Sequence, residues 1–296
     1  MKHSRNLILT IGLYLFALTA SAQNGQLVAD GNSADTYKLM RNCGYNHECP
    51  DSSREHSGKH FQHIQQTFDK DLGKNVFVFY IHAGIDDDRG KANINDRQRN
   101  EIKTDGKSPK ELVAQEGETM VYKWKFKLPK GFVTTSKFSH IHQLKGLDNK
   151  EKNADVGQPL MTFTCYTQSN GKQVMRLRYN NRTTGETETL EKTPLDDFID
   201  SWVEVEETVK YGAEGAYCVT IKRVKDGKVL LDYKNDKLDM WRTGTTGLRP
   251  KWGIYRYLGK NREWQSQLRD EEIRFADFSI EKTNCNSCKK KECKKQ

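Results

Sequence analysis

The sequence of 296 residues has only one long apolar run, Leu7–Leu18, near its start. This run is too short to span a bilayer comfortably, and no later stretch approaches the ~20 apolar residues that a transmembrane helix needs. It follows a basic start with Lys2 and Arg5, and it precedes a small-residue pattern ending at Ala22. The pattern predicts a signal peptide over residues 1–22, and therefore a secreted or periplasmic protein without a membrane span.

Other absences narrow the class of protein further. We find no long amphipathic helix and no internal repeat, which argues against helical bundles and solenoids. No nucleic-acid-binding module is visible, so nucleic acid is not an expected partner. No strand has the alternating acidic pattern of a sandwich-type glycoside hydrolase, and Asp86–Asp88 lacks the spacing of an EF-hand calcium loop. We interpret Asp86–Asp88 as a solvated turn.

The charge is positive overall but lies mostly at the ends. The formal net charge is +9; removing Lys2 and Arg5 leaves +7, and the stretch from Glu281 to Gln296 carries +4, so the body holds about +3. Seven cysteines in an exported chain allow disulfides and leave one unpaired. Cys43 and Cys49 are close enough in sequence to close a small ring, whereas Cys165 and Cys218 are interpreted as buried thiols.

What the chain does contain is a series of short segments with the period-two alternation of strands, separated by Gly, Asn and Asp turns. This series predicts an all-β fold, a two-sheet antiparallel jelly-roll sandwich of the concanavalin-like kind with a concave groove. The domain is expected over residues 23–281, with a Lys- and Cys-rich tail over 282–296. The strand candidates are 63–68, 75–80, 98–104, 119–128, 138–144, 160–167, 174–179, 202–209, 216–224, 228–234, 251–257 and 272–280.

Three of these strands carry polar residues at alternate positions, so each can present a polar row on one sheet face. The opposite face would bury Ile102, Ile141, Trp202, Trp252 and Ile254. Arginine, histidine and tyrosine together can bind a carboxylate and move a proton, which indicates an active site for an acidic substrate. The rows are Arg97, Arg99, Glu101 and Lys103; His140 and His142; and Lys251, Tyr255 and Tyr257.

The three segments resemble the signature of jelly-roll polysaccharide lyases. Alginate lyases of this architecture carry Arg-x-Glu-Leu-Arg, Gln-Ile-His and Lys-x-Gly-x-Tyr strands, and the counterparts in this chain are Arg99-Asn-Glu-Ile-Lys103, His140-Ile-His142 and Lys251-Trp-Gly-Ile-Tyr255. The last segment also resembles the Gly-Ile-Tyr-Arg of heparin lyase I-type enzymes. The closest resemblance is to the ulvan lyase family. His140 in place of Gln and Lys103 in place of Arg leave the uronate and its linkage open.

The resemblance implies β-elimination, in which a base removes the C5 proton of a uronate and an acid protonates the leaving oxygen at C4. Cationic donors must stabilise the charge that develops on the carboxylate, and Arg99 is suited to this, assisted by His140 and Lys145. Tyr255 is expected to act as the acid, and also as the base if cations lower its pKa, while His142 is the other candidate base. Glu101 is expected to orient Arg99.

Further residues are expected to bind substrate: Arg97, Lys103, Arg176, Arg178, Lys251 and Tyr257. The chemistry needs no cofactor. The resemblance also implies a structural calcium ion, for which Asp277 and Asp30 are the candidate ligands. We expect a monomer whose partner is an acidic polysaccharide. The alternative function is a non-catalytic carbohydrate-binding protein of the same fold, which would need no acid–base pair.

Overall fold

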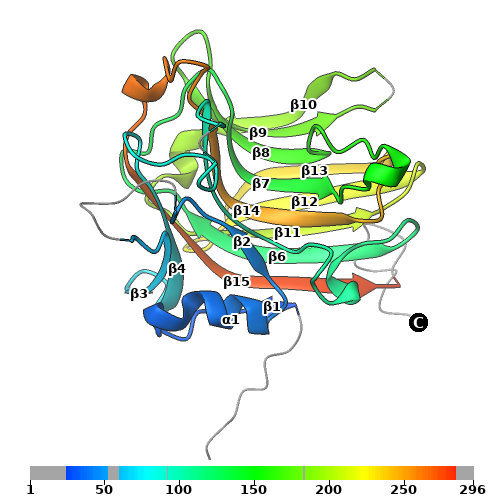
Figure 1. The fold of residues 1–296 in the computed structure, drawn as a ribbon, viewed down its shortest axis with the longest axis horizontal. Helices are drawn as coiled ribbons and strands as arrows, with labels where there is room; N and C mark the ends of the chain where they lie inside the picture. Colours follow the sequence, from blue (N-terminus) through cyan, green and yellow to red (C-terminus); the bar gives the residue numbers. More distant parts are fainter. Residues whose placement is uncertain (1–24, 53–59, 92, 183, 285–296) are drawn as a thin grey trace, which may run out of the picture.

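The computed structural model describes residues 25–52, 60–91, 93–182 and 184–284, which form two antiparallel sheets packed face to face. Figure 1 shows the strands of the two sheets stacked in layers, with the short helix α1 at the bottom beside β1 and β15. The predicted signal peptide and most of the predicted tail lie outside the described residues. Among the described residues, no helix is long and apolar enough to cross a membrane.

Sheet A has eight strands, in the order β13-β12-β11-β6-β15-β4-β3, with β1 pairing with β15. Its strands are β1 Gln26–Leu27, β3 Ile64–Asp69, β4 Lys74–Ile81, β6 Thr119–Lys127, β11 Val203–Lys210, β12 Gly215–Arg223, β13 Val229–Leu238 and β15 Glu271–Thr283.

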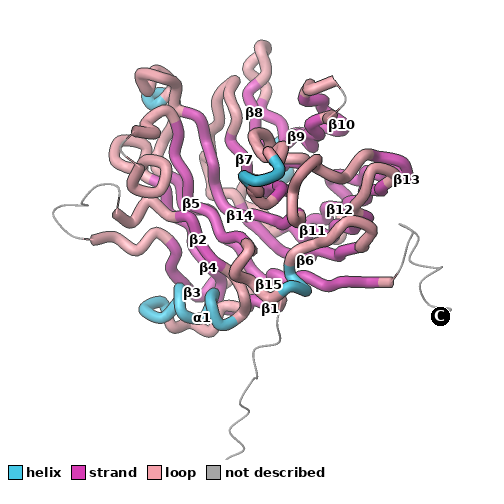
Figure 2. Tube along the Cα trace, turned by 45° about the vertical axis from the view of Figure 1, so that its right-hand side comes forward, coloured by secondary structure: helices cyan, strands magenta, loops and turns pink. Residues whose placement is uncertain are grey.

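Sheet B has seven strands, in the order β10-β9-β8-β7-β14-β5-β2. Figure 2 shows β5, β14 and β2 side by side in this sheet. Its strands are β2 Asn46–Glu48, β5 Arg97–Lys103, β7 Ser139–Gly146, β8 Met161–Thr167, β9 Gln173–Asn180, β10 Thr187–Pro194 and β14 Leu248–Tyr257. The helical segments are η1 Ser33–Asp35, α1 Thr36–Asn42, η2 Lys110–Leu112, η3 Lys150–Lys152, η4 Leu195–Phe198 and η5 Gln265–Gln267.

The hydrophobic core lies between the sheets, because alternate residues of each strand point inward. Trp124 of β6 contacts Trp252 of β14 and Phe163 of β8, with ring centroids 6.3 and 5.9 Å apart. Of the residues predicted to face the core, Ile102, Ile141, Trp252 and Ile254 do so. Trp202 is buried instead in a separate small cluster with Val76 and Ala276.

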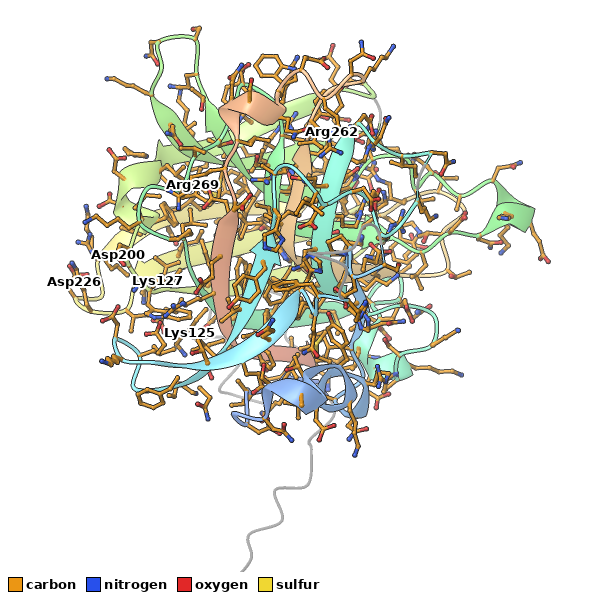
Figure 3. The ribbon with its side chains drawn as sticks, turned by 60° about the vertical axis from the view of Figure 1, so that its left-hand side comes forward. Lys125, Lys127, Asp200, Asp226, Arg262 and Arg269 are labelled. Atoms are coloured by element: carbon orange, nitrogen blue, oxygen red, sulfur yellow. The ribbon has the colours of Figure 1, made fainter. Side chains whose placement is uncertain are left out.

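Surface ion pairs tie strands to neighbouring loops. Figure 3 labels Lys127 and Asp200 close together; the Lys127 ammonium lies 3.1 Å from the Asp200 carboxylate and 2.5 Å from that of Asp71. Lys127 is itself buried, whereas both carboxylates are exposed to solvent.

The cysteine predictions are partly corrected. Cys43 and Cys49 are both free thiols, so the small ring does not form. Cys165 is a buried thiol, as predicted. Cys218 is half-buried and disulfide-bonded, which the buried-thiol interpretation missed.

Candidate active site

The three polar segments meet at the middle of sheet B, on the face that points away from sheet A, which we call the outer face. β14 lies between β5 and β7, and Tyr255 stands opposite Arg99 on β5 and opposite His140 on β7. Residues directly opposite in an antiparallel pair have side chains in contact range. Arg99, His140 and Tyr255 therefore lie side by side on the outer face, as predicted; their catalytic roles stay a prediction.

His142 does not lie with them. It is fully buried in the core, where its ring contacts those of Trp124 and Trp252. Its Nδ1 atom lies 2.8 Å from the carbonyl oxygen of Lys251, and its Nε2 atom lies 3.0 Å from the Glu207 carboxylate of sheet A. The prediction that His142 shares a face with His140, and with it the candidate role of base, is wrong.

The cause is an irregularity in β7. The pairing of β7 with β8 shifts between His140 and His142, so β7 has one extra residue there. A bulge of this kind reverses the alternation of side chains beyond it. Ile141 and His142 consequently both point inward, and Gln143 takes the outward position, where its amide donates a hydrogen bond to Glu101.

Arg99 lies beneath Tyr255 rather than in solvent. Its guanidinium carbon is 3.7 Å from the centroid of the Tyr255 ring, a cation–π contact. Its Nε donates to Asp88 at 2.9 Å, and its Nη1 donates to Glu101 at 2.7 Å. Because these carboxylates engage its donors, Arg99 is placed to hold Tyr255, and the expected contact of Glu101 with Arg99 is present.

A buried charge network continues from Arg99 along β5 and β14. Lys251 donates to Glu101 at 3.0 Å and also to Glu48 of β2, and Lys103 donates to Glu48 at 3.0 Å. Although burial raises the pKa of Glu101, the charges of Lys251 and Arg99 lower it to about 2. Lys103 and Lys251 are thus paired with carboxylates of the protein.

Sequence reasoning missed two of these carboxylates. Glu48 lies in a segment without strand periodicity, so nothing in the sequence marked it. The interpretation of Asp86–Asp88 as a solvated turn is wrong, because Asp86, Asp87 and Asp88 are all buried. The backbone of Asp88 forms a bridge with Arg99 of β5, which brings its carboxylate under the site.

Tyr255 is held at its hydroxyl as well as at its ring. Arg97 donates from Nη1 to the Tyr255 oxygen at 2.7 Å, while its Nε and Nη2 donate to Asp96 at 2.6 and 2.7 Å. Burial raises the pKa of Tyr255, against the opposing charges of Arg99 and Arg97. The phenol is therefore protonated at neutral pH, and it is chemically an acid.

His140 is the neighbouring group able to accept a proton. Its ring lies 5.8 Å from that of Tyr255 between centroids and stacks on Phe138 at 4.7 Å. Its Nδ1 atom lies 2.8 Å from the Thr164 hydroxyl. Burial, followed by the charge of Arg178, lowers the pKa of His140 to about 3, so the imidazole is neutral.

Four further cations lie on the outer face without a carboxylate in ion-pair range among the described residues. Arg178 and Lys145 act electrostatically on His140, and Arg249 stands opposite Lys145 on β14. Arg176 and Arg178 stand opposite Thr164 and Thr162 on the outer face, and Arg176 lies over the ring of Tyr166 at 3.5 Å. Burial and the charge of Arg99 lower the pKa of Lys145 to about 8. The four are Lys145, Arg176, Arg178 and Arg249.

The remaining predicted residues lie at the rim or elsewhere. Tyr257 is half-buried at the end of β14, with its ring 5.6 Å from that of Phe138. Asp277 is engaged by two ammonium groups, from Lys74 at 2.5 Å and Lys125 at 2.7 Å. The Asp30 carboxylate accepts a hydrogen bond from the backbone of Asn32. The geometry gives the expected calcium site at Asp277 and Asp30 no support.

Comparison with known proteins agrees with this fold. A family model described as polysaccharide lyase matches residues 51–271. None of the curated proteins compared with the chain matches it significantly.

Solved structures of similar fold include a family 7 alginate lyase in complex with its substrate, at 14% identity and a TM-score of 0.53, covering 82% of this chain and 94% of that one. They also include a marine alginate lyase from Aplysia kurodai, at 12% identity and a TM-score of 0.53, covering 88% and 98% of the two chains. At these identities the likeness shows the fold alone, a two-sheet jelly-roll sandwich.

Proposed function

The chain belongs to the polysaccharide lyase family, and we propose that it cleaves a uronate-containing polysaccharide by β-elimination on the outer face of sheet B. The observation that carries this proposal is the pair formed by Tyr255 and His140. A protonated phenol and a neutral imidazole stand opposite each other on adjacent strands, at the centre of the predicted polar rows. β-Elimination needs a base that reaches the C5 proton and an acid that reaches the leaving oxygen of the same bound sugar.

In the proposed reaction, His140 removes the C5 proton of the uronate, the C4–C5 double bond forms, and the C4–O bond breaks. Tyr255 gives its proton to the leaving oxygen. His140 is then protonated and Tyr255 is a phenolate, and exchange with solvent restores both. The negative charge of a bound uronate raises the pKa of a nearby imidazole, which strengthens His140 as a base when substrate is present.

Lys145 and Arg178 are the proposed partners of the substrate carboxylate. Both act electrostatically on His140, and neither has a carboxylate in ion-pair range among the described residues. They can therefore stabilise the charge that develops on the substrate as C5 loses its proton. Arg99, with Asp88 and Glu101 on its donors, holds Tyr255 in place instead.

We favour ulvan, a sulfated polysaccharide, as the substrate. The support is the number of cations: Lys145, Arg176, Arg178 and Arg249 exceed what one carboxylate requires, and sulfate groups at neighbouring sugars would engage the others. Glucuronan, alginate and heparin-like chains are the alternatives. The predicted signal peptide supports a site of action outside the cytoplasm.

The experiment is incubation with ulvan, glucuronan, alginate and heparin while the ultraviolet absorbance of unsaturated uronate is followed. We expect a rise with ulvan. We also expect that Tyr255→Phe abolishes turnover while its circular dichroism spectrum and its retention on immobilised substrate are unchanged. Tyr233→Phe is the matched control, because Tyr233 lies on β13 of the other sheet, and it should retain most of the activity.

Flat absorbance on every polysaccharide, with retention on immobilised ulvan, would favour the non-catalytic binding protein. Near-wild-type turnover by Tyr255→Phe would show that the assignment of the acid is wrong.

A further inference from the structure

A second cluster of titratable side chains lies outside the candidate active site, at the end of sheet A. His63 immediately precedes β3, His82 immediately follows β4, and Asp86 belongs to the loop that leads to β5. One donor atom from each of the three lies within 4.8 Å of the others. The His63 and Asp86 side chains are 0% and 1% exposed, so the cluster is largely shielded from water.

One carboxylate faces both imidazoles. The Oδ1 atom of Asp86 is 3.0 Å from His63 Nε2, and its Oδ2 atom is 3.1 Å from His82 Nδ1. The two imidazole rings lie 5.4 Å apart between centroids, and Phe61 packs edge-on against both. Ligand atoms around a tetrahedral metal ion lie about 3.3–3.6 Å apart, since each lies ~2.0–2.2 Å from the metal. The Asp86 oxygens lie at a similar distance from the two imidazole nitrogens.

A further carboxylate fixes the orientation of His63. Asp51 Oδ1 lies 2.8 Å from His63 Nδ1 and also accepts the backbone N–H of His63 at 3.0 Å. With the Nδ1 proton donated to Asp51, Nε2 can offer its lone pair to an ion that lies between it and Asp86. Histidine ligands of metals typically donate their other N–H to a carboxylate in this way.

We propose that His63, His82 and Asp86 bind a divalent transition-metal ion of the zinc type, with a fourth donor completing the coordination. Two imidazole nitrogens and one carboxylate suit zinc, whereas calcium and magnesium prefer oxygen ligands. The carboxylates of Asp51 and Asp86 supply two negative charges, which balance the charge of the ion when both imidazoles are neutral.

Two arginines lie near the loop that carries Asp86. Arg262, labelled in Figure 3, donates from Nη2 to the backbone oxygens of Ala83 and Asp86 at 3.0 and 3.3 Å. Arg256 donates to Gln98 and to the backbone of Arg269. Arg262 therefore holds the main chain of the loop at Ala83 and Asp86.

The ion would hold the loop that supports the candidate active site. Gln98 of β5 donates to the carbonyl oxygens of His82 and Asp86, and two residues later in the loop Asp88 accepts from Arg99. A metal joining β3, β4 and this loop would therefore fix Asp88 under Arg99. The binding of metal itself does not depend on the proposed lyase activity.

The test uses the full chain, treated with a chelator, incubated with zinc chloride and dialysed, after which zinc per chain is measured by mass spectrometry. We expect about one zinc ion per chain that His82→Ala loses. His82 is partly exposed, so its replacement should leave the fold, checked by circular dichroism, intact. His47→Gln is the matched control: this histidine stacks on Tyr37, and its replacement should leave the zinc content unchanged.

Two further measurements sharpen the test. Asp51→Asn should weaken zinc binding about 10–100-fold, because Asp51 orients His63 without binding the ion. Cobalt bound in place of zinc should give visible absorption bands that His82→Ala lacks. Wild-type protein that takes up no zinc, or His82→Ala protein that retains it at the wild-type level, would overturn the proposal.

Discussion

At the scale of single residues, two lysines of the site have a pKa close to neutral pH: Lys251, which Glu48 and Glu101 engage, and Lys145, which has no carboxylate in ion-pair range among the described residues. Burial and the charge of Arg99 lower the pKa of Lys145 to about 8, so its ammonium is present below pH 8 and is lost above it. If Lys145 binds the substrate carboxylate, affinity must fall as the pH rises through 8. We expect KM to increase several-fold between about pH 7 and pH 9.5, which steady-state kinetics would measure.

Lys145→Arg provides the comparison for this prediction, since a guanidinium stays protonated across that range. KM should then stay nearly constant between pH 7 and pH 9.5. An identical rise in the variant would mean that another group controls the affinity.

At the scale of secondary-structure elements, the strands that combine alternation with apolar content were predictable, and the others were not. Each predicted strand overlaps a strand of the structure, from β3 to β15. Strand β2, with only Asn46–Glu48, and the exposed edge strand β10 were not predicted, because their sequences show too little alternation of apolar and polar residues. The helix α1 was likewise missed, because seven residues give too few turns for an amphipathic pattern.

The bulge in β7 explains why the site was only partly predictable. The sequence His140-Ile141-His142 alternates perfectly, and alternation alone places both histidines on one face. The extra residue arises where β7 pairs with β8, and the sequence of β7 alone does not predict how the two strands pair. Arg99 and Tyr255 were correctly brought together because β5 and β14 pair without interruption.

β14 also depends on one glycine beside the site. Gly253 has φ 145°, and a Cβ atom there would lie 2.1 Å from the backbone oxygen of Asn100 on β5. Gly253→Ala must therefore push β14 away from β5. We expect a loss of at least about 1–3 kcal/mol in the free energy of unfolding, measured with urea, together with reduced turnover.

Gly106→Ala is the matched control, because a Cβ at Gly106 meets nothing within 4 Å and its φ is not positive. Its effect on unfolding should stay within about 0.5 kcal/mol. A Gly253→Ala protein as stable as this control would show that β5 and β14 separate without cost.

At the scale of the whole molecule, the net charge and the local charge of sheet B predict different strengths of attraction for a polyanionic substrate. The body of the chain carries only a small positive excess, but the outer face of sheet B gathers four cations that lack ion-paired carboxylates among the described residues. Attraction of a polyanion should therefore be local to this face. We expect KM for ulvan to rise roughly tenfold or more between low salt and ~0.5 M NaCl.

Two variants locate this effect. Arg176→Ala should weaken both the affinity and its salt dependence, whereas Lys222→Ala, which removes an exposed cation from β12 of the other sheet, should change neither. Equal effects of the two variants would indicate attraction by the total charge.

The strand order also has a consequence for how the chain is made. β14 lies in the interior of sheet B, between β7 and β5, and β15 lies in the interior of sheet A, between β6 and β4. Both come from residues 248–283, which leave the ribosome after every other strand. Until then each sheet remains in two halves, and the polar cluster cannot assemble. Neither sheet can therefore be completed, and the candidate site cannot form, before the last strands of the chain have been synthesised.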